Sequence, residues 1–344
     1  MPLNPDLSLV VQVFALFFQT RWLVRWQQQW LQQHPLPPRP PRPKAGDSRT
    51  RKQRPKKQPR GTPPSRFYQR IFSLRVTLWY LLFQRLNFDH SLGAVLVDVR
   101  RGGANRLGPK GRKLSQRVRS TQTSAYSQAR QRLPLELLVA ALAHLRQAVV
   151  KLVGGEPAPR QKPAPDQRTR QLLDGSTLAV LLTPLLAQAY PPASNQQGQS
   201  DWCLLRIVVG FCARSGAVLS AIEGAVQQSE QTLAWALMAG ASAFTLWIGD
   251  RNFGVWSVVA KAVSCDQDVL VRLTRARAAK LCRGRLLSSG QERPLDWSPS
   301  RHDRLPPDTE RKPVSGRLIY VRLHKGTHWI DLWLLYGLEP SFGG

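Results

Sequence analysis

The stretch that decides the fold runs Ala243-Phe-Thr-Leu-Trp-Ile-Gly249 and is followed directly by Asp250. A short apolar run this rich in aromatic and β-branched side chains predicts a strand that is buried on both faces. Residues 230–238 before it and 255–264 after it show helical periodicity, and residues 268–273 predict another buried strand. Strands that alternate with helices in this way are typical of an α/β protein.

Three further strands precede this stretch in the chain. Residues 170–180 predict a first strand with a break at Gly175. Residues 202–213 and 217–226 predict a hairpin, because a polar Arg-Ser-Gly turn joins them. The resulting order is strand, hairpin, helix, strand, helix, strand. We therefore expect an α/β fold with one mixed sheet flanked by helices, in the element order of an RNase H-like core.

Composition divides the 344-residue chain into six segments. Pro-rich, basic stretches cannot bury enough apolar surface to offset their ordering entropy, so they mark flexible arms and linkers. Helical patterns dominate between two such stretches, and strand patterns dominate after the second. The segments are an N-terminal amphipathic helix (1–33), a basic Pro-rich arm (34–66), a helical basic region expected to bind DNA (67–153), a Pro-rich linker (154–169), the RNase H-like core (170–274), and basic loops with a partial β-rich insertion (275–344).

The N-terminal segment contains an apolar run and a tryptophan stripe. The run Leu7–Phe18 is too short to span about 30 Å of hydrocarbon, and it lacks the flanks of a signal peptide. Trp22, Trp26 and Trp30 recur at a spacing that places them on one face of a helix. Packing of this stripe on the rest of the domain is the favoured interpretation, docking on a membrane surface is the alternative, and we expect no membrane partner.

The chain is strongly basic, with 50 Lys and Arg against 21 Asp and Glu and a formal net charge of +29. Such a surface indicates a polyanionic partner, and double-stranded DNA is the favoured one because each neutralised phosphate releases condensed counterions. An anionic membrane and a merely solvated surface are the alternatives. The residues that we expect to contact DNA are Arg100, Arg101, Arg112, Lys113, Arg117, Arg119, Arg130, Arg132 and Arg251.

Cysteine usage indicates neither a disulfide framework nor a zinc site. The four cysteines include no C-x-x-C pair, and the histidines show no metal-ligand spacing with them. A reducing cytosol is therefore the simplest expectation.

Two aspartates are notable for their positions: Asp174 lies in the first strand, and Asp250 directly follows the fourth. If these strands are neighbours in one sheet, both carboxylates converge, and carboxylate oxygens are the ligands that Mg²⁺ or Mn²⁺ prefers. Two such cations stabilise the attacking and leaving oxygens of a phosphodiester displacement. Alternatively, an Asp of this kind forms a turn through local backbone hydrogen bonds. Because both residues fall at corresponding strand positions in a basic chain, the metal site is favoured.

Ordered motifs resemble those of the insertion-sequence DDE transposases, the family whose third motif is a Y-R-E-K helix. Residues 124–134, Ser-Ala-Tyr-Ser-Gln-Ala-Arg-Gln-Arg-Leu-Pro, are similar to a segment that precedes the family's first aspartate. Leu173-Asp-Gly-Ser-Thr177 resembles the first-aspartate motif, and Gly249-Asp-Arg-Asn-Phe-Gly254 resembles the second. Residues 77–90 are similar to the family's N-terminal helical region, so the resemblance covers most of the chain.

This resemblance implies a DNA transposase in which Asp174 and Asp250 are the first two catalytic carboxylates and Mg²⁺ or Mn²⁺ is the cofactor. The implied reaction is hydrolysis at the 3′ ends of an insertion element, followed by attack of those hydroxyls on target DNA. The implied partners are element ends and target DNA, bridged by a homodimer at the nucleoid of the bacterial cytoplasm. Arg251 would contact phosphate, and a salt bridge to a neighbouring loop is the alternative.

The chain departs from the family pattern at the third catalytic residue. No third catalytic Glu is found: Glu292 and Glu310 lie in basic stretches without the motif, and Glu339 precedes Pro340. We therefore expect a copy shortened at its C-terminus, with little or no strand transfer by this chain alone. The alternatives are a non-catalytic DNA-binding remnant and another RNase H-fold nuclease. Asn252 replaces the usual small residue of the second motif, which we expect to tighten its turn.

Overall fold

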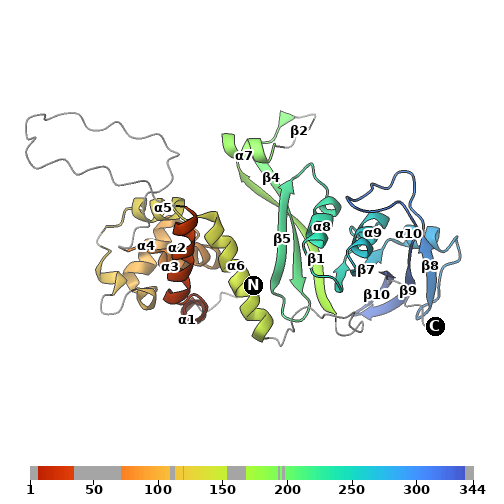
Figure 1. Cartoon of the computed structure of the whole chain (residues 1–344), viewed down its shortest axis with the longest axis horizontal. Helices are drawn as coiled ribbons and strands as arrows, with labels where there is room; N and C mark the ends of the chain where they lie inside the picture. Colours follow the sequence, from red (N-terminus) through yellow and green to blue (C-terminus); the bar gives the residue numbers. More distant parts are fainter. Residues whose placement is uncertain are drawn as a thin grey trace, which may run out of the picture. The chain divides into compact units, whose positions relative to one another are not determined.

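The computed structural model describes residues 7–34, 71–108, 113–118, 120–152, 168–192, 194–195 and 198–337. The chain falls into two compact units, Met1–Ala148 and Val149–Gly344. The first unit is helical, and the second is built around a sheet (Figure 1). Each unit has a buried apolar cluster of its own, as a domain requires.

The first unit is an assembly of short helices around α3. That helix is apolar nearly all round, so it is buried on most sides, and it contacts α1, α2, α4 and α5. The largest fully buried side chains of this unit include Trp79 and Tyr80 of α3 and Tyr126 of α5. The helices are α1 (Leu7–Phe17), α2 (Thr20–Gln33), α3 (Leu74–Leu86), α4 (Leu92–Arg101), α5 (Ser124–Gln131) and α6 (Leu135–Leu152), with short 3-10 turns η1 (Asn105–Leu107) and η2 (Leu114–Gln116).

The N-terminal segment forms two helices, α1 and α2, where a single one was expected. They separate at Phe18, whose ring is buried in the core of the first unit. Trp22 stacks on the ring of His144 at 4.8 Å, and His144 Nε2 lies 2.9 Å from the carbonyl oxygen of Phe17. The first member of the tryptophan stripe thus packs within its own unit. Among the described helices, none is both long and apolar enough to cross a bilayer.

A buried polar network joins α3 to α4 and α5. The Tyr80 hydroxyl donates to Asp98 Oδ2 at 2.8 Å, and the Tyr126 hydroxyl donates to Gln84 Oε1 at 2.8 Å. Burial raises the pKa of the Asp98 carboxyl group, and the hydrogen bond from Tyr80 opposes part of that rise. Burial also raises the pKa of Tyr126 to about 12. The fold therefore favours the neutral form of each group more than the unfolded chain does.

We expect Asp98→Asn to make the stability of the first unit less dependent on pH. Because the folded-state pKa of Asp98 is raised, the folded chain binds more protons than the unfolded chain in the window above the ordinary pKa of about 3.9. The contribution of this carboxyl to stability is therefore lost as the pH rises through that window. Asparagine keeps an acceptor for Tyr80 but does not titrate. In thermal unfolding, the melting temperature of the variant should rise relative to that of the wild type between about pH 4 and neutral pH. A difference in melting temperature that does not change with pH would contradict the expectation.

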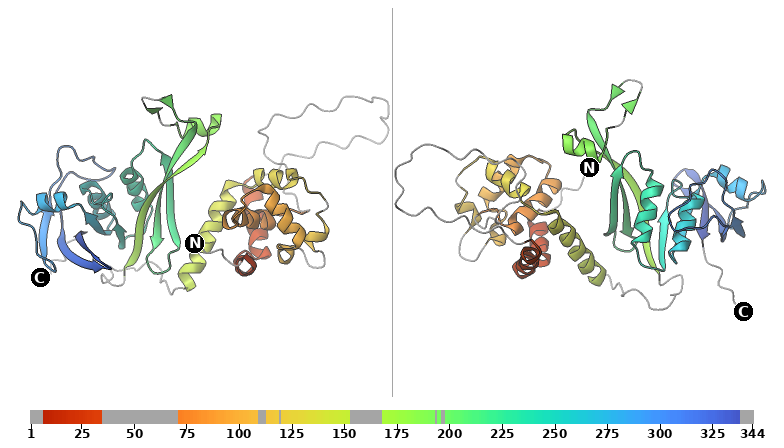
Figure 2. Two further views of the ribbon diagram at one scale, coloured as in Figure 1. Left: turned by 180° about the vertical axis from the view of Figure 1, so that it is seen from behind. Right: turned by 45° about the horizontal axis from the view of Figure 1, so that its top comes forward.

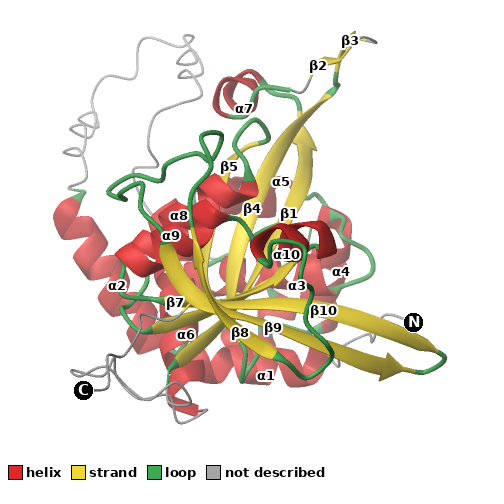
Figure 3. Ribbon diagram, turned by 90° about the vertical axis from the view of Figure 1, so that its right-hand side faces the viewer, coloured by secondary structure: helices red, strands yellow, loops and turns green. Residues whose placement is uncertain are grey.

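The second unit contains an eight-stranded mixed sheet in the order β5-β4-β1-β6-β7-β10-β9-β8 (Figure 1, Figure 3). β1 is antiparallel to β4 and parallel to β6, and β6 is parallel to β7. The described elements are β1 (Thr169–Leu181), α7 (Pro184–Ala189), β2 (Ser194–Asn195), β3 (Gly198–Gln199), β4 (Trp202–Cys212), β5 (Val218–Ala225), α8 (Glu230–Ala239), β6 (Thr245–Gly249), α9 (Trp256–Ser264), β7 (Asp268–Leu273), α10 (Arg275–Leu281), β8 (Glu292–Trp297), β9 (Val314–Lys325) and β10 (His328–Gly337).

The expected α/β class, with a mixed sheet flanked by helices, is confirmed. The expected hairpin is present as β4 and β5, with β4 next to β1 in the sheet, and Figure 2 shows this green part of the sheet from two further directions.

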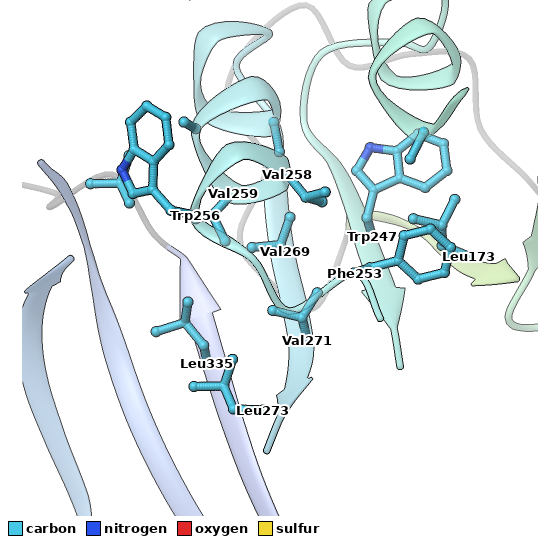
Figure 4. Packing of buried hydrophobic residues seen from close by; sticks show 14 of the residues in the cluster. Leu173, Trp247, Phe253, Trp256, Val258, Val259, Val269, Val271, Leu273 and Leu335 are labelled. Carbon is cyan, nitrogen blue, oxygen red and sulfur yellow. The ribbon is translucent and has the colours of Figure 1, made fainter. Parts of the chain in front are cut away.

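One face of the sheet packs against α8 and α9. Side chains alternate along a strand, so β1 directs buried Leu173 toward these helices and exposed Asp174 away from them. Leu173, Trp247 and Val269 come from three neighbouring strands and share one cluster with Val259 of α9 (Figure 4). The apolar core of this unit therefore lies on the opposite face of β1 from Asp174.

Two local expectations from the sequence were wrong. Gly175 does not break the first strand, because it pairs with Val208 inside a continuous β1–β4 ladder. The residues between Thr274 and β9 are not only basic loops, because they include the helix α10 and the edge strand β8. β8 is mostly exposed and α10 is exposed or half-buried at most positions, with Ala278 and Trp297 as their buried apolar residues, so neither produces a clear hydrophobic period.

Candidate functional site

The register between β1 and β6 sets Asp174 beside Asp250. In this parallel ladder Leu173 lies opposite Gly249, the last residue of β6. Asp174 and Asp250 are the next residues of the two segments, so their backbones are neighbours where β6 ends. Adjacent strands are about 4.8 Å apart, a separation at which two carboxylates can reach one ion. The expectation that the first and fourth strands are neighbours is confirmed.

Both carboxylates are exposed, and each accepts one local backbone hydrogen bond. Asp174 Oδ1 accepts from the N–H of Gly175 at 2.9 Å, and Asp250 Oδ1 accepts from the N–H of Asn252 at 2.9 Å. Such local bonds are the ones expected if each aspartate only stabilises a turn. A carboxylate has about four acceptor positions, however, so one such bond leaves capacity for a cation. In the part of the chain that the structure describes, neither aspartate forms an ion pair.

A third carboxylate, Glu230, lies near the turn that follows β6. It is the first residue of α8, and it accepts a hydrogen bond from the side-chain amide of Asn252. Its carboxyl end also stands over Gly175, where an added Cβ would come within 2.5 Å of Glu230 Cδ. As an acidic residue in the first turn of α8, Glu230 also interacts favourably with the helix dipole. A glycine inside a strand is the signal that indicates such a close approach.

The donor set at the end of β6 fits a hard divalent cation. Asp174 and Gly175 point to opposite faces of β1, so Glu230 stands on the other side of the strand from Asp174. Consistent with this, no group of three or more His, Cys, Asp or Glu side chains among the described residues is placed to hold a metal. Mg²⁺ commonly binds through one or two protein carboxylates, with water and substrate phosphates as its other ligands. Asp174 and Asp250 match that mode.

Several predicted DNA-contacting residues lie at helix ends of the first unit. Arg100 and Arg101 are exposed in the last turn of α4, and α4 contacts η2, which Lys113 and Arg117 flank. Positive charge at a helix C-terminus interacts favourably with the helix dipole, and the same charge can bind a phosphate. These four residues are therefore near one another in the fold.

The remaining predicted DNA-contacting residues are dispersed. Arg130 is exposed, with its guanidinium 5.8 Å from the Tyr126 ring centroid, and Arg132 donates to Gln128 Oε1 at 3.2 Å. Arg251 belongs to the second unit, where it is exposed next to Asp250. Arg112 and Arg119 lie outside the described residues.

The glutamates considered for the third catalytic position are not brought to the aspartates where the structure describes them. Glu292 lies in β8, five strands from β1 in the sheet, and it pairs with Arg317 at 2.7 Å. Glu310 is exposed and lies 3.1 Å from Lys312. Glu339 lies outside the described residues.

Comparison with known proteins adds no assignment. No protein-family model matches the sequence, and no curated protein matches it.

Proposed function

We propose that this chain is the DNA-binding and DNA-cleaving part of an insertion-sequence transposase, with an RNase H-like core in its second unit. The observation that carries the proposal is the β1–β6 register that sets Asp174 beside Asp250. The antiparallel neighbour β4 on one side of β1 and the parallel strands β6 and β7 on the other support the RNase H-like interpretation. The ordered motifs around both aspartates support the transposase assignment.

In this proposal Asp174 and Asp250 hold Mg²⁺ or Mn²⁺, which supplies charge stabilisation to the attacking and leaving oxygens of a phosphodiester. The protein's own task is to position the DNA strand and to neutralise its charge. Arg251 is exposed beside Asp250, which suits it to bind a phosphate next to the scissile bond. Asp174 faces away from the packed core, so a strand of DNA can approach it without displacing the helices.

The net charge of +29 supports DNA as the partner, in the form of element ends and target DNA. As proposed, two copies bridge two DNA ends, and the protein acts at the nucleoid of the bacterial cytoplasm.

Plasmid nicking tests the proposed chemistry. The purified full chain is incubated with supercoiled plasmid and Mn²⁺, beside reactions with EDTA and with the Asp174→Asn and Asp250→Asn variants. We expect slow nicking that disappears with EDTA and in both variants, because the charge of each carboxylate is needed to hold the cation. Nicking that both variants retain would overturn the assignment of the two aspartates.

The same experiment separates the alternatives. Joined DNA products in addition to nicks would support strand transfer, and cleavage without any joined product would favour another RNase H-fold nuclease. Salt-dependent DNA binding without nicking would favour a DNA-binding protein that lacks catalysis.

We expect the double variant Arg100→Gln, Arg101→Gln to bind double-stranded DNA more weakly and with a smaller salt dependence. If each side chain neutralises one phosphate, the slope of log affinity against log salt should fall by about 2 in magnitude. Fluorescence anisotropy at several salt concentrations measures that slope. Arg85→Gln is the matched control, because Arg85 is exposed in the last turn of α3. An equal change in the control would show that these two positions have no special role.

A further inference from the structure

The turn after β6 is tied to α8 through one residue, Asn252. Its side-chain amide nitrogen donates to Glu230 Oε2. Its carbonyl oxygen and its Oδ1 both accept from Gln231 Nε2, at 3.0 Å and 3.1 Å. Its backbone N–H donates to Asp250 Oδ1 at 2.9 Å. Asn252 therefore connects the first two residues of a helix to one of the two candidate metal-binding carboxylates.

An asparagine suits this position because its amide group both donates and accepts. A small apolar residue would keep only the backbone contacts. The departure from the family's second motif thus has a structural counterpart in the first turn of α8.

The helix at the other end of these bonds is firmly anchored. The buried residues Leu233, Trp235, Leu237 and Met238 of α8 belong to the core cluster of the second unit. Gly175 leaves the room in which the Glu230 side chain reaches the turn, because an added Cβ would meet its carboxyl group. The hydrogen bonds of Asn252 therefore link the Asp250 turn to a helix that packs on the core face of the sheet.

We propose that Asn252 is a positioning residue, which with Glu230 and Gln231 orients Asp250 for cation binding beside Asp174. This inference rests on the proposed function. Partners that orient a metal ligand typically contribute about 10-fold to 100-fold to metal affinity. Glu230 acts in this arrangement as a hydrogen-bond acceptor, because it stands on the opposite face of β1 from Asp174.

Titration of the full chain with Mn²⁺, followed by the electron paramagnetic resonance of the free ion, tests the inference. We expect Asn252→Ala and Glu230→Ala each to weaken binding by about 10-fold to 100-fold, and the double variant to lose little more because both remove one linkage. Glu230→Gln keeps an oxygen acceptor for Asn252, so its affinity should stay near that of the wild type. A merely structural role would change the melting temperature without this pattern.

The outcomes separate this inference from the proposed function. If Asp174→Asn abolishes Mn²⁺ binding but Asn252→Ala binds like the wild type, the positioning role is wrong and the metal site stands. If Asp174→Asn binds like the wild type, or if the wild type does not bind Mn²⁺, both are wrong. A loss in Glu230→Gln as large as in Glu230→Ala would show that the charge of Glu230 matters, which also overturns the positioning role.

A second variant covers the case in which Asn252→Ala fails to fold. Gly175→Ala displaces the flexible end of the Glu230 side chain and leaves the sequence of the turn intact. We expect weaker Mn²⁺ binding by this variant, and an unchanged affinity would contradict the inference.

Discussion

Asp174→Asn is expected to weaken Mn²⁺ binding by the purified chain by at least about 100-fold. Asparagine has nearly the same size and keeps an oxygen that can accept from the N–H of Gly175. It lacks the negative charge, however, and that charge is half of the pair formed with Asp250 at the end of β6. A cation beside one exposed carboxylate has little more than the weak attraction of an open surface. The same Mn²⁺ titration measures the change.

The matched control for this prediction is Asp201→Asn. Asp201 is also exposed, but it adjoins the far end of the β1–β4 ladder, where Trp202 pairs with Leu181. We expect this control to bind Mn²⁺ like the wild type. Asp174→Asn should also melt like the wild type, since the side chain points away from the core. Equal losses of Mn²⁺ affinity in the two variants would show that Asp174 is not part of a specific metal site.

Asp268→Ala is expected to destabilise the second unit by about 3–5 kcal/mol. Asp268 begins β7, and its carboxylate forms an ion pair with Arg168, which precedes β1. Both residues are buried, so the variant leaves the guanidinium inside the protein without its counter-charge. Since β1 and β7 flank β6, the ion pair links the strands on either side of the central one. Hydrogen exchange of the β6 and β7 amides, followed by mass spectrometry, measures the loss of stability of the second unit separately from the first.

The double variant Arg168→Met, Asp268→Leu tests whether the cost comes from the unpaired charge. Apolar replacement of a buried ion pair is often close to neutral because no charge has to be desolvated. We therefore expect amide protection near that of the wild type. If the double variant is as unstable as Asp268→Ala, the volume or shape of these side chains, rather than their charge, is what matters.

The strands of the second unit could be predicted well because their burial leaves a local signature. The strand Asp268–Leu273 was predicted to the residue, and the hairpin of β4 and β5 differs from its prediction by one residue at most ends. β6 begins at Thr245 rather than at Ala243. Phe244 has a positive φ of 62°, which interrupts an extended strand. Positive φ is rare for an apolar residue, so the sequence does not predict this conformation.

The candidate site could be predicted only in part. Asp174 and Asp250 follow from strand order, because neighbouring parallel strands bring corresponding positions together. The role of Glu230 could not be predicted, since its contacts with Gly175 and Asn252 depend on how α8 crosses the sheet. Sequence periodicity reports which face of a helix is buried, but it does not report where the helix begins relative to a distant turn.

The alternation of Leu173 and Asp174 along β1 determines which substitutions the gene for this protein can accumulate without loss of the fold. One residue maintains the interior and its neighbour faces outward, so a substitution can remove the proposed reactivity and leave the scaffold intact. Under the proposed function, a copy that lost its outward carboxylate would still fold and would still occupy DNA. Inactive copies would then compete with active ones for the same DNA ends, and the proposed element would restrain its own spread.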